Sequence, residues 1–175
     1  MLRLALILAV LAAPGFADVY RDRSVPMRVQ AALEIERYLG KWYEIARFPN
    51  SFERGCVGVT AEYAQLAGGE ISVRNTCYQG ALDGPVEVAN GTARVEGPGR
   101  LSVTFVPWLP FARGAYWVLH LEPDYSMAVV GSPKGRTGWI LARSPQISPE
   151  VRARAEVALA LNGYDINRLE DVLQR

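Results

Sequence analysis

Histidine and cysteine are scarce in this chain of 175 residues, which contains one histidine and two cysteines. A catalytic triad needs an imidazole base, and a zinc site needs three or four histidine, cysteine or carboxylate ligands, so this scarcity argues against both. The histidine, His120, is expected on the outward face of a strand, where a general-base role has little support. No glycine-rich phosphate loop precedes a helix. The sequence therefore predicts no catalytic residue, no metal and no cofactor.

Long apolar runs are also missing, because the ten residues from Leu4 to Ala13 are too few to span a bilayer. Arg3 precedes this run, and the small residues Gly15 and Ala17 follow it, which is typical of a removable export signal. We expect residues 1–17 to be removed and 18–32 to form an N-terminal extension. Since no cysteine follows the cleavage point, no lipid anchor is expected there. The sequence predicts an exported, soluble protein.

Clusters of basic residues are absent as well. The chain has 19 lysines and arginines against 18 acidic residues, and the arginines are scattered between the acids. Proteins that bind nucleic acids gather basic side chains to neutralise phosphates, so no nucleic-acid partner is predicted. Hydrophobic residues make up 50% and charged residues 21% of the chain, which is the balance of a folded protein. At this length, one domain with one core is expected.

The two cysteines are Cys56 and Cys77. In an exported chain two cysteines favour one disulfide, because the compartments beyond the inner membrane are oxidising. The sequence leaves two alternatives to a disulfide. In the first, both thiols are free and buried; in the second, Cys56 is a nucleophile whose thiolate is stabilised by the nearby Arg54. A disulfide between the two cysteines would exclude the nucleophile.

From Lys41 to Ser144 the chain consists of short segments rich in β-branched and aromatic residues, separated by turn-forming residues. Connections such as 67–69 and 97–99 are short, so consecutive strands should be antiparallel hairpin partners. Closing this up-and-down sheet into a barrel would remove its exposed edges. The predicted fold is thus an all-β, eight-stranded antiparallel barrel, with strands at 41–48, 57–66, 70–78, 85–95, 100–106, 115–122, 126–132 and 137–143.

Alternation along these strands predicts one apolar face that lines the barrel interior. The residues placed inward are Val57, Val59, Ala61 and Tyr63, then Ile71 and Val73, Leu101, Val103 and Phe105, Trp117, Leu119 and Leu121, Val129, and Trp139 and Leu141. A barrel of eight strands is either filled by its side chains or holds one small ligand. The pattern alone does not decide between these two.

One helix is predicted after the strands. Ser148 is a suitable N-cap, Pro149 occupies the first helical position, and Asn162 with Gly163 end the helix. Its apolar face should pack against the outside of the barrel. The tail that follows has apolar spacing compatible with either a short helix or an added strand.

The run YLGKWYEIARF from Tyr38 to Phe48, with FER following at 52–54, resembles the first signature of the lipocalins. Its glycine–x–tryptophan core is Gly40 and Trp42, and the run is most similar to the bacterial lipocalin and apolipoprotein D branch. Residues 122–125 resemble the acidic turn before the seventh strand, and Arg143 resembles the arginine that ends the eighth. The resemblance covers about residues 33–175, which we take as the lipocalin domain.

These motif residues also have a physical interpretation as structural elements. Gly40 allows a close chain crossing beneath the barrel, Trp42 fills its closed end, and Arg143 can lie over the indole ring. Asp124 can accept hydrogen bonds from the backbone N–H groups of its own turn, and Tyr125 can cover the closed end of the barrel. We therefore assign Gly40, Trp42, Asp124, Tyr125 and Arg143 to structure rather than to ligand binding.

The resemblance implies that the other end of the barrel is open and that a periplasmic carrier binds a fatty acid, a lysophospholipid or a similar lipid there, for transport, storage or membrane maintenance. Such a protein is not an enzyme, and it acts as a monomer or homodimer. The alternatives are a packed core, or an enzyme that holds an apolar substrate beside Cys56. The candidate ligand-binding residues are Val59, Ala61, Val73, Asn75, Phe105, Trp108, Tyr116, Trp117, Leu119, Val129, Trp139 and Leu141.

The segment from Val106 to Gly114 is unusual for a loop because it carries three large apolar residues, Trp108, Leu109 and Phe111. At the open end these side chains would gate the cavity or touch a membrane surface transiently, while Arg113 would meet a headgroup phosphate. Ordinary packing over the barrel end is the alternative.

Overall fold

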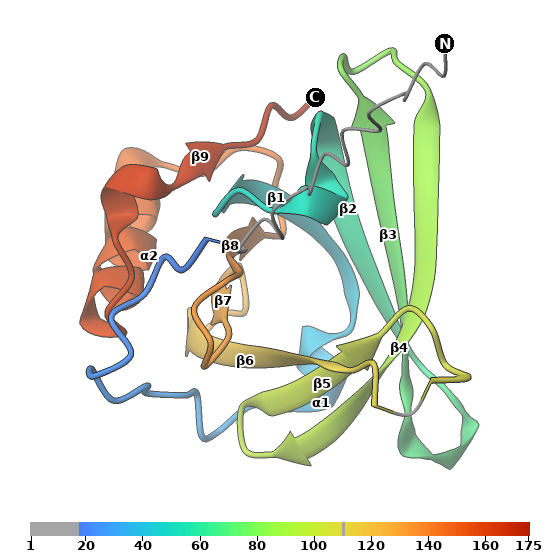
Figure 1. Cartoon of the computed structure of the whole chain (residues 1–175), viewed down its shortest axis with the longest axis horizontal. Helices are drawn as coiled ribbons and strands as arrows, with labels where there is room; N and C mark the ends of the chain where they lie inside the picture. The colour runs from blue at the N-terminus through green and yellow to red at the C-terminus, as the bar shows by residue number, and fades with distance from the viewer. Residues whose placement is uncertain (1–17, 110) are drawn as a thin grey trace, which may run out of the picture.

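The computed structural model describes residues 18–109 and 111–175, so the predicted export signal lies outside the described residues. Eight antiparallel strands close into a barrel, and one helix of 13 residues lies against its outer wall (Figure 1). The predicted fold class is confirmed. The strands are β1 (Gly40–Arg47), β2 (Cys56–Gln65), β3 (Ile71–Gln79), β4 (Val86–Gly97), β5 (Arg100–Thr104), β6 (Gly114–Leu121), β7 (Met127–Gly131), β8 (Gly138–Ala142) and the short β9 (Glu170–Asp171).

β1 closes the barrel because it pairs with a different neighbour on each edge. Its first residues, Gly40 to Tyr43, pair with β2, and its later part pairs with β8. On the edge that β2 leaves free, β9 pairs with Ala46 and Arg47. The tail that the sequence left open between helix and strand thus begins with the short 3-10 helix Ile166–Arg168 and then adds a strand.

The wall of the barrel is uneven along β4. Figure 1 shows β3 and β4 as a long hairpin that rises beside the rest of the sheet. β4 pairs with β3 from Val86 onward, but its pairing with β5 begins only at Thr92, opposite Thr104. The first half of β4 therefore has one free edge, and the chain between β5 and β6 passes this end of the barrel.

The helix α2 (Pro149–Leu161) begins and ends as predicted. The Ser148 side chain accepts a hydrogen bond from the Val151 backbone N–H at 3.3 Å, and Gly163 follows the helix with a φ of +84°. A further short helix, α1 (Ile35–Tyr38), precedes β1 and was not predicted. None of the helices within residues 18–109 and 111–175 is long and apolar enough to cross a bilayer.

Apolar side chains form two main clusters, one inside the barrel and one between its outer wall and α2. Three residues predicted to face the interior belong to the outer cluster or pack against it, namely Trp117, Leu119 and Val129. That part of the prediction is wrong. Because α2 and residues 20–29 cover the outside of β6, β7 and β8, both faces of these strands are apolar and alternation no longer marks the interior.

Candidate functional site: the barrel cavity

The closed end of the barrel is built from the motif residues. Trp42 is completely buried, and the Arg143 guanidinium lies 3.8 Å from the centroid of its ring. Arg143 also donates hydrogen bonds of 2.8 Å to three backbone carbonyls in the segment before β1 and at its start. Gly40 has a φ of +92°, and a Cβ there would lie 3.3 Å from Arg143 Nη1. These contacts support a structural role for all three residues.

The turn before β7 supports the same end. Asp124 Oδ1 accepts hydrogen bonds from the Ser126 backbone N–H at 3.0 Å and from its hydroxyl at 2.6 Å. The Tyr125 hydroxyl accepts from the Glu34 backbone N–H at 3.0 Å, so it ties the segment before α1 to the barrel. Neither residue lines the cavity described below.

Above this closed end lies a cavity of about 610 Å³ whose lining is mainly apolar. This volume is in the usual range for small-molecule sites, so the barrel is not a filled core. Eight of the twelve predicted ligand-binding residues line it, which are Val59, Ala61, Val73, Asn75, Phe105, Tyr116, Trp139 and Leu141. Trp117, Leu119 and Val129 lie on the outer wall, and Trp108 lies on the loop after β5 without lining the cavity.

The floor of the cavity carries a group of phenols. The Tyr116 hydroxyl lies 2.8 Å from that of Tyr38 and 2.9 Å from that of Tyr63. Burial raises the pKa of all three tyrosines, so they stay protonated at any physiological pH. Tyr63 and Tyr116 line the cavity, whereas Tyr38 lies beneath them. The floor is thus polar but uncharged.

Two buried carboxylates, Glu44 and Glu53, line the cavity and were missed by the sequence interpretation. Glu44 accepts a hydrogen bond of 2.9 Å from Arg47. Glu53 accepts from the Trp139 indole N–H at 3.1 Å and from the Asn50 side chain. A signal for Glu44 was present, because it follows Trp42 by two residues and so shares its inward face.

Burial raises the pKa of Glu44 well above its ordinary value. The nearby carboxylate of Glu53 raises it further, and together these two effects outweigh the attraction of Arg47. Glu44 therefore holds its proton to a higher pH than an exposed glutamate does.

A disulfide joins Cys56 on β2 to Cys77 on β3, which confirms the predicted pair. The bond consumes the thiol of Cys56, so the hypothesis of a nucleophilic Cys56 is wrong. Both half-cystines line the cavity and pack with Val59 and Val172, the latter from the C-terminal tail. The disulfide thus holds part of the cavity wall rather than performing chemistry.

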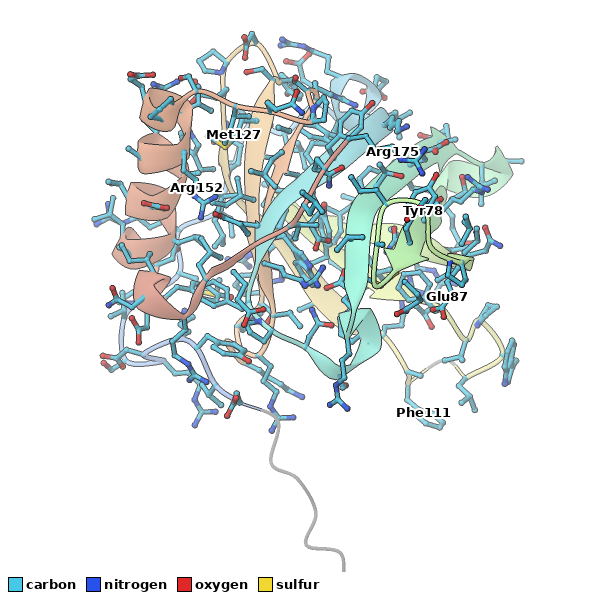
Figure 2. The ribbon with its side chains drawn as sticks, turned by 90° about the horizontal axis from the view of Figure 1, so that it is seen from above. Tyr78, Glu87, Phe111, Met127, Arg152 and Arg175 are labelled. Atoms are coloured by element: carbon cyan, nitrogen blue, oxygen red, sulfur yellow. A yellow bond between two sulfur atoms is a disulfide. The ribbon has the colours of Figure 1, made fainter. Side chains whose placement is uncertain are left out.

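The chain between β5 and β6, which we call the mouth loop (residues 105–109 and 111–113), borders the cavity. Phe105, Val106 and Ala112 line it, whereas the side chains of Trp108 and Phe111 are 73% and 83% exposed. Figure 2 shows Phe111 on a loop that projects from the barrel. Arg113 donates to the Ser102 hydroxyl at 2.9 Å and to its carbonyl at 3.0 Å, so it is held against β5 rather than free to meet a headgroup.

Comparisons with known proteins place this chain among the lipocalins. The family model for the lipocalin-like domain matches residues 33–174. The outer membrane lipoprotein Blc of Vibrio cholerae is 40% identical over 149 residues, covering 81% of this chain and 83% of that protein. Temperature-induced lipocalin-1 of Arabidopsis thaliana is 36% identical over 157 residues, covering 85% and 83%. A solved structure of the cockroach allergen Per a 4 superposes with a TM-score of 0.68 at 18% identity, covering 86% of this chain and 94% of that one.

Proposed function

Because this chain belongs to the lipocalin family, which is known for binding small hydrophobic ligands, we propose that its cavity carries one single-chain lipid, such as a fatty acid or a lysophospholipid. The observation that carries the proposal is the apolar cavity of about 610 Å³ above a closed end. Burying one acyl chain there gains several kcal/mol at about 25 cal/mol per Å². After ordering costs, a dissociation constant on the order of micromolar is expected.

The proposed role is transport or storage of the lipid, or membrane maintenance, rather than catalysis. Support comes from the disulfide, which leaves Cys56 without a thiol, and from the likeness to lipoproteins of the bacterial outer membrane. The N-terminal export pattern of residues 1–17 supports a periplasmic carrier.

A transient contact with a membrane surface is a second part of the proposal. Trp108, Phe111 and Phe52 are largely exposed apolar side chains. Phe52 lines the cavity, and the mouth loop that carries the other two borders it. Exposed apolar groups beside a cavity entrance would let a lipid pass from the bilayer with little contact with water.

Filling the cavity from its wall tests the binding proposal. Ala61 faces the cavity on β2, whereas Ala64, three residues later on the same strand, is exposed and does not line it. An Ala61→Trp variant should lose binding of a single-chain amphiphile by at least about tenfold, because the indole occupies the space of the acyl chain. An Ala64→Trp variant should bind as the parent does.

Displacement of a fluorescent apolar probe measures both affinities, and circular dichroism confirms that each variant is folded. If a folded Ala61→Trp variant still bound the amphiphile with the parent affinity, the cavity would not be the binding site.

A further inference from the structure

The ionisable side chains described in the cavity lining are all acids. Among the described residues that line it, the ionisable ones apart from the phenols are the carboxylates Glu44, Glu53 and Glu87, and no lysine, arginine or histidine is present. Glu87 lies on β4, as Figure 2 shows. It accepts a hydrogen bond of 3.1 Å from the Gln79 side chain. An anionic headgroup would therefore meet repulsion inside this cavity and no compensating cation on its walls.

Of the two buried carboxylates, Glu44 alone pairs with a guanidinium among the described residues. Arg47 donates to Glu44 at 2.9 Å and uses its other terminal nitrogen for the Cys56 carbonyl at 2.9 Å. The groups that donate to the Glu53 carboxylate are uncharged, namely the Trp139 indole N–H and the Asn50 amide. If both carboxylates are ionised, this buried group carries one uncompensated negative charge. Such a charge is costly unless a proton or a cation balances it.

Two further features of the lining suit a cationic hydrogen-bond donor. Asn75 Oδ1 is buried and has no hydrogen-bond partner among the described residues, so the lining offers an acceptor that lacks a donor. The rings of Phe52 and Trp139, whose centroids lie 6.5 Å apart, line the cavity beside Glu53. Aromatic faces next to a carboxylate attract ammonium groups through their quadrupoles.

We propose that the cavity selects amphiphiles whose headgroup carries an ammonium group and discriminates against those that end in a carboxylate. The ammonium is held by Glu44 and Glu53 beside the rings of Trp139 and Phe52, and the apolar tail fills the rest of the cavity. The inference rests on the proposed lipid-binding function, which it narrows by headgroup charge. Fatty acids become poor ligands, and single-chain lipids with an amine become good ones.

Three probes with ten carbon atoms each test this inference, namely decylamine, 1-decanol and decanoate. At pH 7 the amine is a cation, the alcohol is neutral, and the carboxylate is an anion. In the parent protein, decylamine should bind at least about tenfold more tightly than decanoate, with decanol between them. Titration calorimetry or displacement of a fluorescent probe gives the three dissociation constants.

In a Glu44→Gln/Glu53→Gln double variant, the ratio of the decanoate and decylamine dissociation constants should fall to within about threefold. The single Glu53→Gln variant, which keeps the Glu44–Arg47 pair, should lower the ratio in the same direction if the double variant does not fold. Glu62→Gln is the matched control, because it removes a carboxylate that pairs with Arg74 and does not line the cavity. That control should keep the parent ratio.

The outcomes separate this inference from the function on which it rests. If none of the three probes bound the parent protein, the proposed lipid binding itself would fail. If decanol bound but decanoate bound as tightly as decylamine, only the charge selection would be overturned. A preference for the amine that persists in the folded double variant would also overturn it.

Discussion

Glu44 shows how strongly a single buried carboxylate responds to its surroundings. Its side chain is almost fully buried in the cavity wall, where it pairs with Arg47 and lies near Glu53. Burial is the largest influence and favours the protonated form, so the pKa of Glu44 is raised above its ordinary value despite the ion pair. Protonation of this residue is thus linked to folding.

We expect the free energy of unfolding to depend on pH because of this titration. Because the folded-state pKa is above the unfolded one, Glu44 contributes most favourably below about pH 4.5, and its contribution declines as the pH rises toward the folded-state pKa. The free energy of unfolding of a Glu44→Gln variant should therefore increase relative to that of the parent as the pH rises from 4.5. The gain is at most about 1.4 kcal/mol per pH unit.

Urea denaturation of both proteins between pH 4.5 and 8 measures the difference. The half-exposed carboxylate Glu62, replaced by glutamine, serves as the control and should show a nearly constant difference. A Glu44→Gln variant that loses stability relative to the parent with rising pH would show instead that Arg47 keeps the carboxylate ionised.

At the scale of elements, the C-terminal tail completes a gap in the barrel wall. The Val172 backbone N–H donates to the Ile45 carbonyl at 2.9 Å, and the Gly58 N–H donates to the Leu173 carbonyl at 2.7 Å. The Val172 side chain packs on both half-cystines and on Val59. Figure 1 shows the chain end beside β1 and β2. The tail therefore lies between β1 and β2 and covers the disulfide.

Removal of residues 172–175 should expose this disulfide. The truncated protein loses the side chain that covers Cys56 and Cys77, so a soluble thiol should reduce the bond at least several-fold faster than in the parent. Trapping of free thiols during exposure to dithiothreitol measures the rate. A Leu173→Ala variant keeps the tail's backbone contacts and changes only an exposed side chain, so it should be reduced at the parent rate. An unchanged rate in the truncated protein would contradict the covering role.

At the scale of the whole molecule, two of the surfaces that carry exposed apolar side chains differ in their relation to the cavity. One is the mouth loop with Trp108 and Phe111, which borders the cavity. The other is the outer side of α2 with Val157 and Leu161, neither of which lines the cavity. If the cavity entrance contacts membranes, changes in the mouth loop should weaken binding to a bilayer and changes on α2 should not.

A Trp108→Ser/Phe111→Ser variant should bind phosphatidylcholine vesicles at least about tenfold more weakly than the parent, because it loses the apolar area that would enter the interface. A Val157→Ser/Leu161→Ser variant removes comparable exposed apolar groups from α2 and should bind as the parent does. Co-sedimentation with vesicles measures both. Equal losses in the two variants, or no loss in the first, would reject the entrance as the membrane-contacting surface.

Much of this protein was determined by local sequence. The strands, α2 with its Ser148 cap, and the closed end around Trp42 follow from alternation, capping residues and short motifs, because each depends on residues close together in the chain. The pairing of Cys56 with Cys77 was also accessible, since two cysteines allow one disulfide.

Tertiary structure alone decided the features that depend on distant contacts. Alternation could not orient Trp117 or Leu119, because α2 and the N-terminal extension bury the outer face of β6 and make both faces apolar. The tail became a strand because β1 offers a free edge beyond β2. The environment of Glu44 depends on how Glu44 and Arg47 on β1 meet Glu53 beyond the turn, and burial, which the sequence does not display, raises the pKa of Glu44.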